Sequence, residues 1–221
     1  MNRTDYAAPL IDSELYAADL YLNHGFNQQL VLGFGVVGGY NPVDFPTPDQ
    51  SMVQANAHLN YTPNRQFSLD VIAGEEYRTF QNLARGSYSM PVFVISAGFA
   101  PNDDIKFGLT ASRQIYNSAA ATAQDYVDTS VNGLLREHIC KPLYFTLLGG
   151  YEHVEYFNAI DLPMPLPTLR DDYFYIQPAA DIVLIRFWIV GGYYLRRQNT
   201  GSVSAVNFRA NEFGVRTTIK F

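Results

Sequence analysis

The feature that most constrains the fold is an alternation of apolar and polar residues that recurs along the chain. In the last nine residues, apolar or small side chains hold every second position, with polar or basic ones between them. The alternating set is Phe213, Val215, Thr217, Ile219 and Phe221. A period of two is typical of a β-strand with one face in apolar surroundings and the other in water. We therefore expect a chain built from half-buried strands.

The same alternation predicts strands throughout the sequence. Eleven are expected, at about 14–23, 29–40, 52–62, 66–79, 89–100, 104–116, 125–137, 143–156, 172–184, 187–197 and 207–221. A twelfth, shorter strand is expected at residues 3–11, where Pro9 restricts it to a sheet edge or a strand end.

Short polar turns alternate with longer connections between these strands. The short turns fall at Asn23–Gln28, Thr62–Arg65, Ala100–Asp104, His138–Pro142 and around Ile185. Two of them share one pattern, an aromatic residue, a small residue and then Pro-Asn. Membrane barrels have the same asymmetry, with tight periplasmic turns and longer external loops.

The composition narrows the class of protein. Apolar runs are too short for helices that cross a membrane, which need about 20 residues. A net charge of -6 with no basic stripe argues against a nucleic-acid partner. The single cysteine, Cys140, excludes an intramolecular disulfide. The four histidines show no zinc-ligand spacing, so no zinc site is expected.

A Gly-and-Tyr pattern follows the short turns by about one strand length. It occurs as Val37-Gly-Gly-Tyr40, Ala73-Gly-Glu-Glu-Tyr77, Leu148-Gly-Gly-Tyr151 and Val190-Gly-Gly-Tyr-Tyr194. With the repeated hairpins, the Pro-Asn turns and the terminal Ile-Lys-Phe, it resembles porin-type bacterial outer-membrane β-barrel proteins. We expect the tyrosines in the aromatic girdle at the outer interface, and the glycines where strands curve tightly.

The resemblance implies a fold, a location and a function. The fold is an all-β, antiparallel, up-and-down transmembrane β-barrel of about twelve strands, with residues 1–221 as a single domain. The location is the bacterial outer membrane, with the C-terminus in the periplasm. Phe213, Val215, Thr217, Ile219 and Phe221 form the C-terminal signal that the barrel-assembly machinery recognises during insertion. The function is passive diffusion of small solutes, without a cofactor.

The N-terminus leaves two expectations open. Residues Met1–Tyr6 are polar and lack the basic-then-apolar pattern of an export signal. We expect either a mature form with an added Met or the C-terminal part of a longer protein. The barrel is accordingly one of twelve strands, or a larger one truncated at its N-terminus. A soluble lipocalin-like barrel is the alternative fold, but it would turn its apolar faces inward.

The polar face of the strands is the predicted lumen lining. Its candidates are Asp70, Glu76, Arg78, Lys106, Arg136, Glu152, Asp181, Arg196, Glu212 and Arg216, with Asp19, Asp128 and Lys220 on the same face. Seven acids face six bases, so the interior is nearly neutral. Such charges either pair into a network that blocks the interior or line a slender, weakly selective pore.

Three functions remain open on the sequence. The first is a porin-like channel, and the second is a closed structural barrel that associates with other envelope components. The third is a hydrolase at the external rim, using His153 with Asp171 and Asp172, although no local motif supports catalysis. Glu75 and Glu76 are no acid/base pair, because neighbours on a strand point to opposite faces. We therefore expect no enzyme.

The expected partners follow from the location. They are outer-membrane lipid and lipopolysaccharide, whose phosphates Arg113 could reach, and the assembly machinery. Other envelope proteins or further copies of the chain are possible partners. No nucleic acid is expected.

Overall fold

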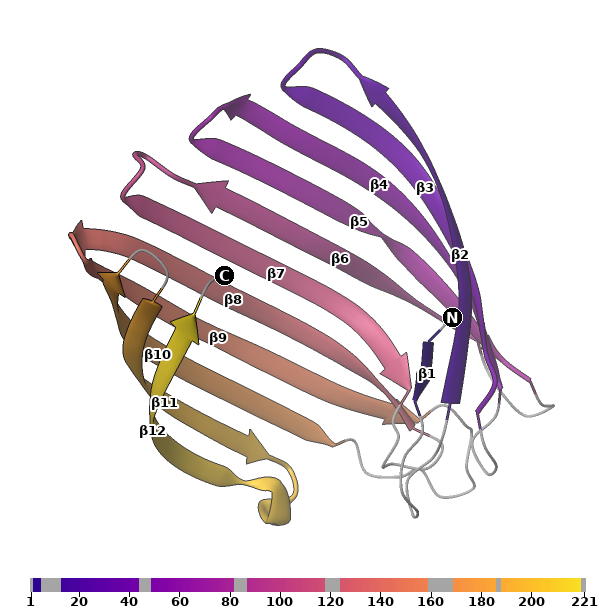
Figure 1. Cartoon of the computed structure of the whole chain (residues 1–221). Helices are drawn as coiled ribbons and strands as arrows, with labels where there is room; N and C mark the ends of the chain where they lie inside the picture. The colour runs from indigo at the N-terminus through magenta and orange to yellow at the C-terminus, as the bar shows by residue number, and fades with distance from the viewer. Residues whose placement is uncertain are drawn as a thin grey trace.

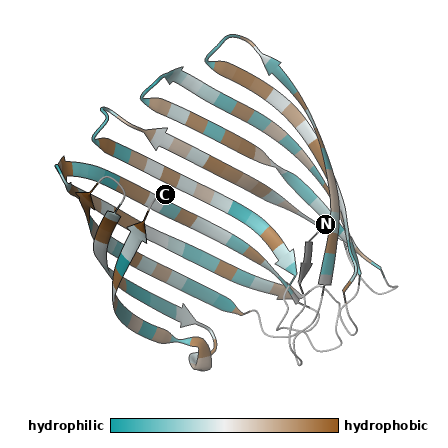
Figure 2. Cartoon of the chain, in the orientation of Figure 1, coloured by the Kyte–Doolittle hydropathy of each residue, from teal (hydrophilic) through white to brown (hydrophobic). Residues whose placement is uncertain are grey.

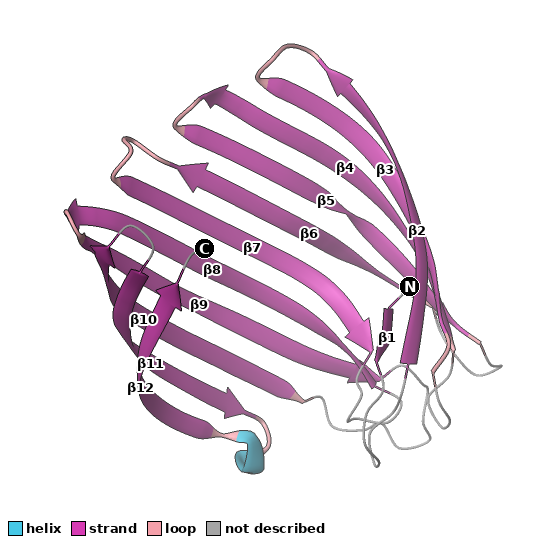
Figure 3. Cartoon of the chain, in the orientation of Figure 1, coloured by secondary structure: helices cyan, strands magenta, loops and turns pink. Residues whose placement is uncertain are grey.

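The computed structural model describes residues 2–4, 13–43, 49–81, 87–117, 124–158, 169–185 and 188–219. In these residues one antiparallel sheet contains twelve strands in chain order (Figures 1 and 3). The strands are β1 (Asn2–Thr4), β2 (Ser13–Gly25), β3 (Leu30–Asn41), β4 (Gln50–Asn64), β5 (Phe67–Phe80), β6 (Tyr88–Phe99), β7 (Ile105–Asn117), β8 (Gln124–Cys140), β9 (Leu143–Asn158), β10 (Arg170–Ile185), β11 (Trp188–Gly201) and β12 (Phe208–Ile219). A single 3₁₀ turn, η1 (Ser204–Val206), precedes β12. None of the helical segments in these ranges is long and apolar enough to cross a membrane.

The eleven predicted long strands are confirmed as β2 to β12. Of the expected strand at 3–11, the structure describes residues 3 and 4, which belong to β1 and pair with β2 between Asn2↔Leu15 and Thr4↔Ser13, and 5–12 lie outside the described residues. The sheet curls strongly and leaves a gap between β2 and β12 (Figure 1). Among the described residues, no ladder joins β12 to β1 or β2.

The direction of the edge strands limits how this sheet can close. Short connections join the strands at one end, which we call the turn end, and longer ones at the loop end (Figure 3). β2 and β12 both run from the loop end to the turn end, so pairing them directly would be parallel. β1 runs the opposite way. An antiparallel closure therefore requires a strand with the direction of β1 between β2 and β12.

The two faces of the sheet differ in polarity, as the alternating colours of Figure 2 show. Residues directly opposite in a ladder share a face, so the registers carry the assignment from strand to strand. One face carries exposed apolar side chains, among them Leu22 at 73% and Leu109 at 52% exposure. The other carries most of the charged and amide side chains, including Asn56, Glu76 and Arg78, which are buried. The predicted division into an apolar and a polar face is confirmed.

Glycines on the polar face let side chains meet across an intervening strand. Tyr175 of β10 donates to Asn132 Oδ1 of β8 at 3.0 Å, passing over Gly150 of β9. A Cβ on Gly150 would lie 2.3 Å from Asn132 Oδ1. Tyr21 and Asn56 meet over Gly35 in the same way, at 3.1 Å. Because side chains two strands apart converge on it, we call this the concave face and the apolar one the convex face.

The glycines of the Gly-and-Tyr pattern have a structural role different from the predicted one, whereas the aromatic girdle of its tyrosines stays a prediction. Gly39 and Gly150 lie on the concave face beneath Met52 and beneath Tyr175 and Asn132, respectively, where a Cβ would clash with those side chains. The tyrosines of the pattern, such as Tyr77 and Tyr151, lie on the convex face and are 48% and 46% exposed. Gly39 and Gly150 therefore provide room for side chains that pack across the strands.

The predicted Pro-Asn turns form one repeated unit. Asn27, Asn64 and Asn102 each accept hydrogen bonds at Oδ1 from the backbone N–H groups two and three residues later. An Asn side chain stabilises a tight turn in this way. Gln29 donates to the Pro63 carbonyl at 2.8 Å, and Gln66 donates to the Pro101 carbonyl at 2.7 Å. Each turn is therefore linked to the next.

We predict that Gly150→Ala lowers the free energy of unfolding by about 1–3 kcal/mol, because the new methyl group displaces the Tyr175–Asn132 hydrogen bond. Gly38→Ala is the matched control, since a Cβ there meets nothing within 4 Å. Urea unfolding of both variants in the same detergent measures the difference. Equal midpoints for the two variants would contradict the packing role of Gly150.

Candidate functional site

The loop end of β7 and β8 departs from the rest of the sheet. The ladder between β6 and β7 stops at Phe93↔Arg113, although β6 begins at Tyr88 and β7 continues to Asn117. The ladder between β7 and β8 continues to Asn117↔Asp125. In Figure 1 the end of β7 bends away from β6. We call residues 114–117 and 125–127 the hairpin end.

The hairpin end is folded over the concave face. Ile115 and Val127 belong to the convex face by register, yet they are only 6% and 3% exposed. They form a core cluster with Val92, a concave-face residue of β6. Phe157 of β9 similarly packs on Tyr88, with ring centroids 4.8 Å apart. Convex-face side chains of one part of the sheet thus pack on the concave face of another.

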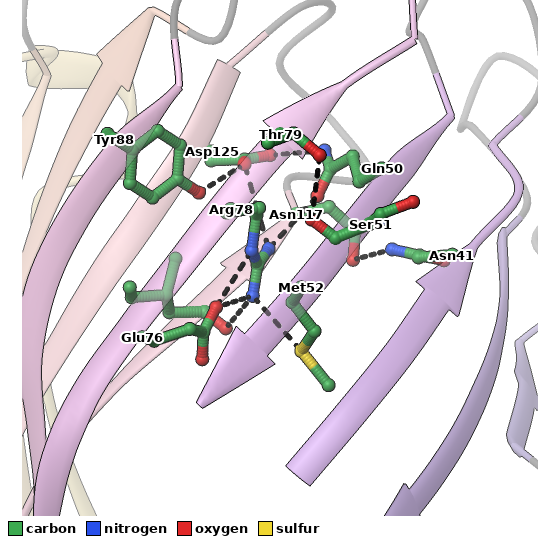
Figure 4. Close-up of polar contacts among 11 residues, drawn as sticks. Asn41, Gln50, Ser51, Met52, Glu76, Arg78, Thr79, Tyr88, Asn117 and Asp125 are labelled. Atoms are coloured by element: carbon green, nitrogen blue, oxygen red, sulfur yellow. Dashed lines mark hydrogen bonds and ion pairs between the residues drawn. The ribbon is translucent and has the colours of Figure 1, made fainter. Parts of the chain in front are cut away.

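A buried polar network joins the hairpin end to the strands beneath it, β4, β5 and β6, which we call the wall (Figure 4). Arg78 donates from Nε and Nη2 to Glu76 Oε1 at 2.8 and 2.5 Å. It also donates to Gln50 Oε1 at 3.0 Å and, across to β7, to the Ile115 carbonyl at 3.1 Å. Its Nη1 lies 3.7 Å from Asp125 Oδ2. Arg78 therefore contacts both the wall and the hairpin end.

Asp125 is the hairpin end's own charged contribution to the network. Its side chain is fully buried and accepts from Gln50 Nε2 at 2.9 Å and from the Tyr88 hydroxyl at 2.8 Å. A second link joins Asn41 Nδ2 of β3 to Asn117 Oδ1 at 3.1 Å. A buried charge needs such partners, because each unpaired one costs several kcal/mol.

The network borders a cavity of about 480 Å³ on the concave side. Its lining mixes apolar side chains such as Met52 and Ile72 with Gln54, Glu76 and Arg78. Among the described residues, no group of three or more His, Cys, Asp or Glu side chains is arranged to hold a metal ion.

Nine of the ten predicted lining residues lie on the concave face. Asp181 accepts two hydrogen bonds from Arg216, at 2.9 and 2.5 Å. Asp70 accepts from Asn60 at 3.0 Å and pairs with His58 at 3.1 Å. The remaining residues of this group are Glu76 and Arg78 in the network, Glu212 at 3.8 Å from Arg197, Glu152 of β9, and Lys106 opposite Arg136 near the turn end.

Arg196 does not lie with them. The register pairs Arg196 with Asn211 and places Glu212 opposite Leu195, so Arg196 shares the convex face with Phe213. The prediction was wrong because β11 carries apolar residues on both faces, as Val190 and Leu195 show. Alternation alone does not fix the phase of such a strand.

The sequence interpretation missed Asp125, Gln50 and Tyr88. Gln50 and Tyr88 are the first residues of their strands, where the alternation of apolar and polar residues does not yet indicate a face. Asp125 follows the parity of the convex face, and only the inward bend of the hairpin end brings it to Arg78.

His153 lies on the convex face toward the loop end. Its Nδ1 is 2.7 Å from Asp172 and its Nε2 is 3.5 Å from Glu155, which also pairs with Arg170. Asp171 takes the other parity and lies on the concave face, opposite Val154. Thr129, opposite His153, accepts a hydrogen bond from Arg113. The structure thus brings His153, Asp172 and Glu155 together in one polar cluster. That this cluster is a hydrolase site stays a prediction.

The residues of the predicted C-terminal signal share one face of β12. Phe213 and Val215 are 80% and 84% exposed on the convex face. Thr217 and Ile219 follow on the same side, opposite Val190 and Trp188. Phe221 and Lys220 lie outside the described residues. Recognition by the assembly machinery remains a prediction.

Comparison with known proteins gives similarity of fold only. No family model and no curated protein matches the sequence. The chain is similar to the loop-L8 deletion mutant of OmpT, an outer-membrane protein of Vibrio cholerae, with 10% identity, 95% of this chain and 96% of that one covered, and a TM-score of 0.44. For the NanC porin the identity is 13%, with 96% of this chain and 100% of that one covered and a TM-score of 0.38. For the CymD monoaromatic hydrocarbon channel the identity is 6%, with 96% of this chain and 86% of that one covered and a TM-score of 0.36.

We predict that Arg78→Ala lowers the free energy of unfolding by about 3–5 kcal/mol, because it leaves Glu76 and Asp125 buried without a cation. The control is Arg216→Ala, whose pair with Asp181 is 44% exposed on the arginine side. Such a pair contributes below about 1 kcal/mol. Denaturant titration followed by Trp188 fluorescence compares the two. A larger loss for the Arg216 variant would contradict the assigned burial.

Proposed function

We propose that the chain is an outer-membrane β-barrel that conducts small solutes passively along its concave face. The observation that carries the proposal is the combination of an exposed apolar convex face with a concave face rich in charges, amides and hydroxyls. In water, exposed side chains such as Phe34, Phe213 and Val215 would be unfavourable, whereas lipid accommodates them. A closed sheet is the β-structure that satisfies its backbone in lipid.

The charge distribution supports a conducting interior. Lys106 and Arg136 lie opposite each other toward the turn end, and both are exposed on the concave face. Arg136 also stacks over the Tyr144 ring, 5.5 Å from its centroid. Toward the loop end the concave face carries Asp128 and Glu152. Rings of charge at the two ends of a pore govern which ions enter it.

The proposed surroundings follow from the same faces. The convex face contacts outer-membrane lipid, and Arg113 with Arg170 provides cations at the level of lipopolysaccharide phosphates. The turn end and the C-terminus face the periplasm. During insertion, the assembly machinery binds β12, and envelope proteins or further copies of the chain are candidate partners afterwards. The proposal involves no enzymatic step and no cofactor.

A closed, structural barrel is the second candidate, and a specific observation favours it. The hairpin end and the Arg78 network fill part of the concave side at the loop end. Purified protein in planar bilayers decides between the two. Discrete conductance steps support the channel, whereas a folded, heat-modifiable protein without steps supports the closed barrel.

We predict that replacing Lys106 and Arg136 together by Gln shifts the reversal potential in a salt gradient toward cation selectivity, because two cations leave the interior. Arg196→Gln is the matched control and leaves the reversal potential unchanged, since Arg196 lies on the convex face. An equal shift in the control would refute the face assignment of β11.

A further inference from the structure

The hairpin end differs from the wall around it in how it is held. The strands beneath it are joined to one another by continuous ladders, such as Phe67↔Phe99 to Arg78↔Tyr88 between β5 and β6. The hairpin end has no ladder to β6 beyond Arg113. Side chains attach it there instead, together with one hydrogen bond to the Ile115 carbonyl. On its other side, β8 stays paired with β9 from Val127↔Glu155 to Asp125↔Phe157, whereas the ladder between β9 and β10 ends at Glu155↔Arg170. The hairpin end can therefore move away from β6 together with the end of β9 without breaking a ladder.

The attachments on the two sides are unequal. Arg78 and Glu76 belong to one strand and stay paired whether or not the hairpin end is present. Asp125 alone brings a charged side chain from the hairpin end, and its three partners, Arg78, Gln50 and Tyr88, all belong to the wall. Removing Asp125 thus takes away the one charged attachment that the hairpin end provides and leaves the ion pair between Arg78 and Glu76 intact.

We infer that the hairpin end is a displaceable constriction of the proposed channel, with Arg78 and Asp125 as the positioning residues that hold it over the concave face. The inference rests on the proposed channel function for its effect on solute flow. Folded in, the hairpin end narrows the loop end to the cavity beside Met52 and Gln54. Swung out, it restores the width that the curled sheet provides. Solutes that fit the cavity pass the closed form, and larger ones need the open form.

The first arm of the test releases the constriction. All variants carry Cys140→Ser, which removes the exposed native thiol. Asp125→Ala is expected to raise single-channel conductance severalfold, and Asp125→Asn, which keeps the shape and can still accept from Tyr88, to give an intermediate value. The Asn variant carries the comparison if the Ala variant does not fold. Arg196→Ala is the control, because Arg196 lies on the convex face of β11, away from the proposed channel.

The second arm closes the constriction covalently. Val92 and Ile115 belong to one core cluster, so Val92→Cys with Ile115→Cys places two thiols on opposite sides of the joint for oxidation to a disulfide. Oxidation is expected to hold conductance at its low value even with Asp125→Ala, and reduction to restore the high value. A structural role of Asp125 in folding alone would not produce this reversal.

The third arm follows the motion without relying on conductance. In a variant with Ile115→Cys as its only thiol, we expect maleimide labelling to be roughly tenfold or more slower with Asp125 present than with Asp125→Ala, because labelling requires local opening. Equal labelling rates with equal conductance would overturn the inference. Faster labelling without conductance in any variant would support the displaceable hairpin end and overturn the channel.

Discussion

The whole structure depends on one sheet whose two faces differ in polarity, one suited to an apolar environment and the other to water. The convex face carries aromatic and aliphatic side chains, and the concave face carries charges, amides and tyrosine hydroxyls. A strand imposes this separation because successive side chains point to opposite sides. Curvature then crowds the concave face, so that side chains from next-but-one strands touch. The glycines at positions 35 and 150 relieve that crowding, and they turn a steric conflict into the Tyr21–Asn56 and Tyr175–Asn132 hydrogen bonds.

Much of this architecture was predictable because it depends on local rules. The long strands follow from alternation, and the Pro-Asn turns follow from the ability of Asn to bond the backbone ahead of it. The faces of β4, β5 and β12 were assigned correctly, since each has a clearly more polar side. Nine of the ten residues predicted to line the lumen therefore lie on the concave face. Arg196 did not, because β11 is apolar on both sides and its phase is set only by pairing with β12.

The arrangement of the hairpin end could not be predicted, because there the burial of a side chain no longer follows the face that the register assigns to it. Ile115 and Val127 have the positions of lipid-facing residues and the burial of core residues. Asp125 has the parity of the convex face and bonds to concave-face partners. These contradictions share one cause, the inward bend beyond Arg113. No pattern within residues 105–137 encodes that bend, because its stabilisation comes from Gln50, Arg78, Tyr88 and Val92 on other strands.

The kind of interaction at this joint bears on what the hairpin end can do. An apolar joint of the same size would be hard to open, because each exposed CH₂ group costs about 0.8 kcal/mol. A buried ion pair gives little net stability, since desolvation offsets most of the attraction, but it fixes geometry. At this joint a small apolar cluster, Val92 with Ile115 and Val127, lies beside a charged network that includes Arg78 and Asp125. Admission of water would solvate those charges as the hairpin end departs, so the joint combines a defined closed position with a modest cost of opening.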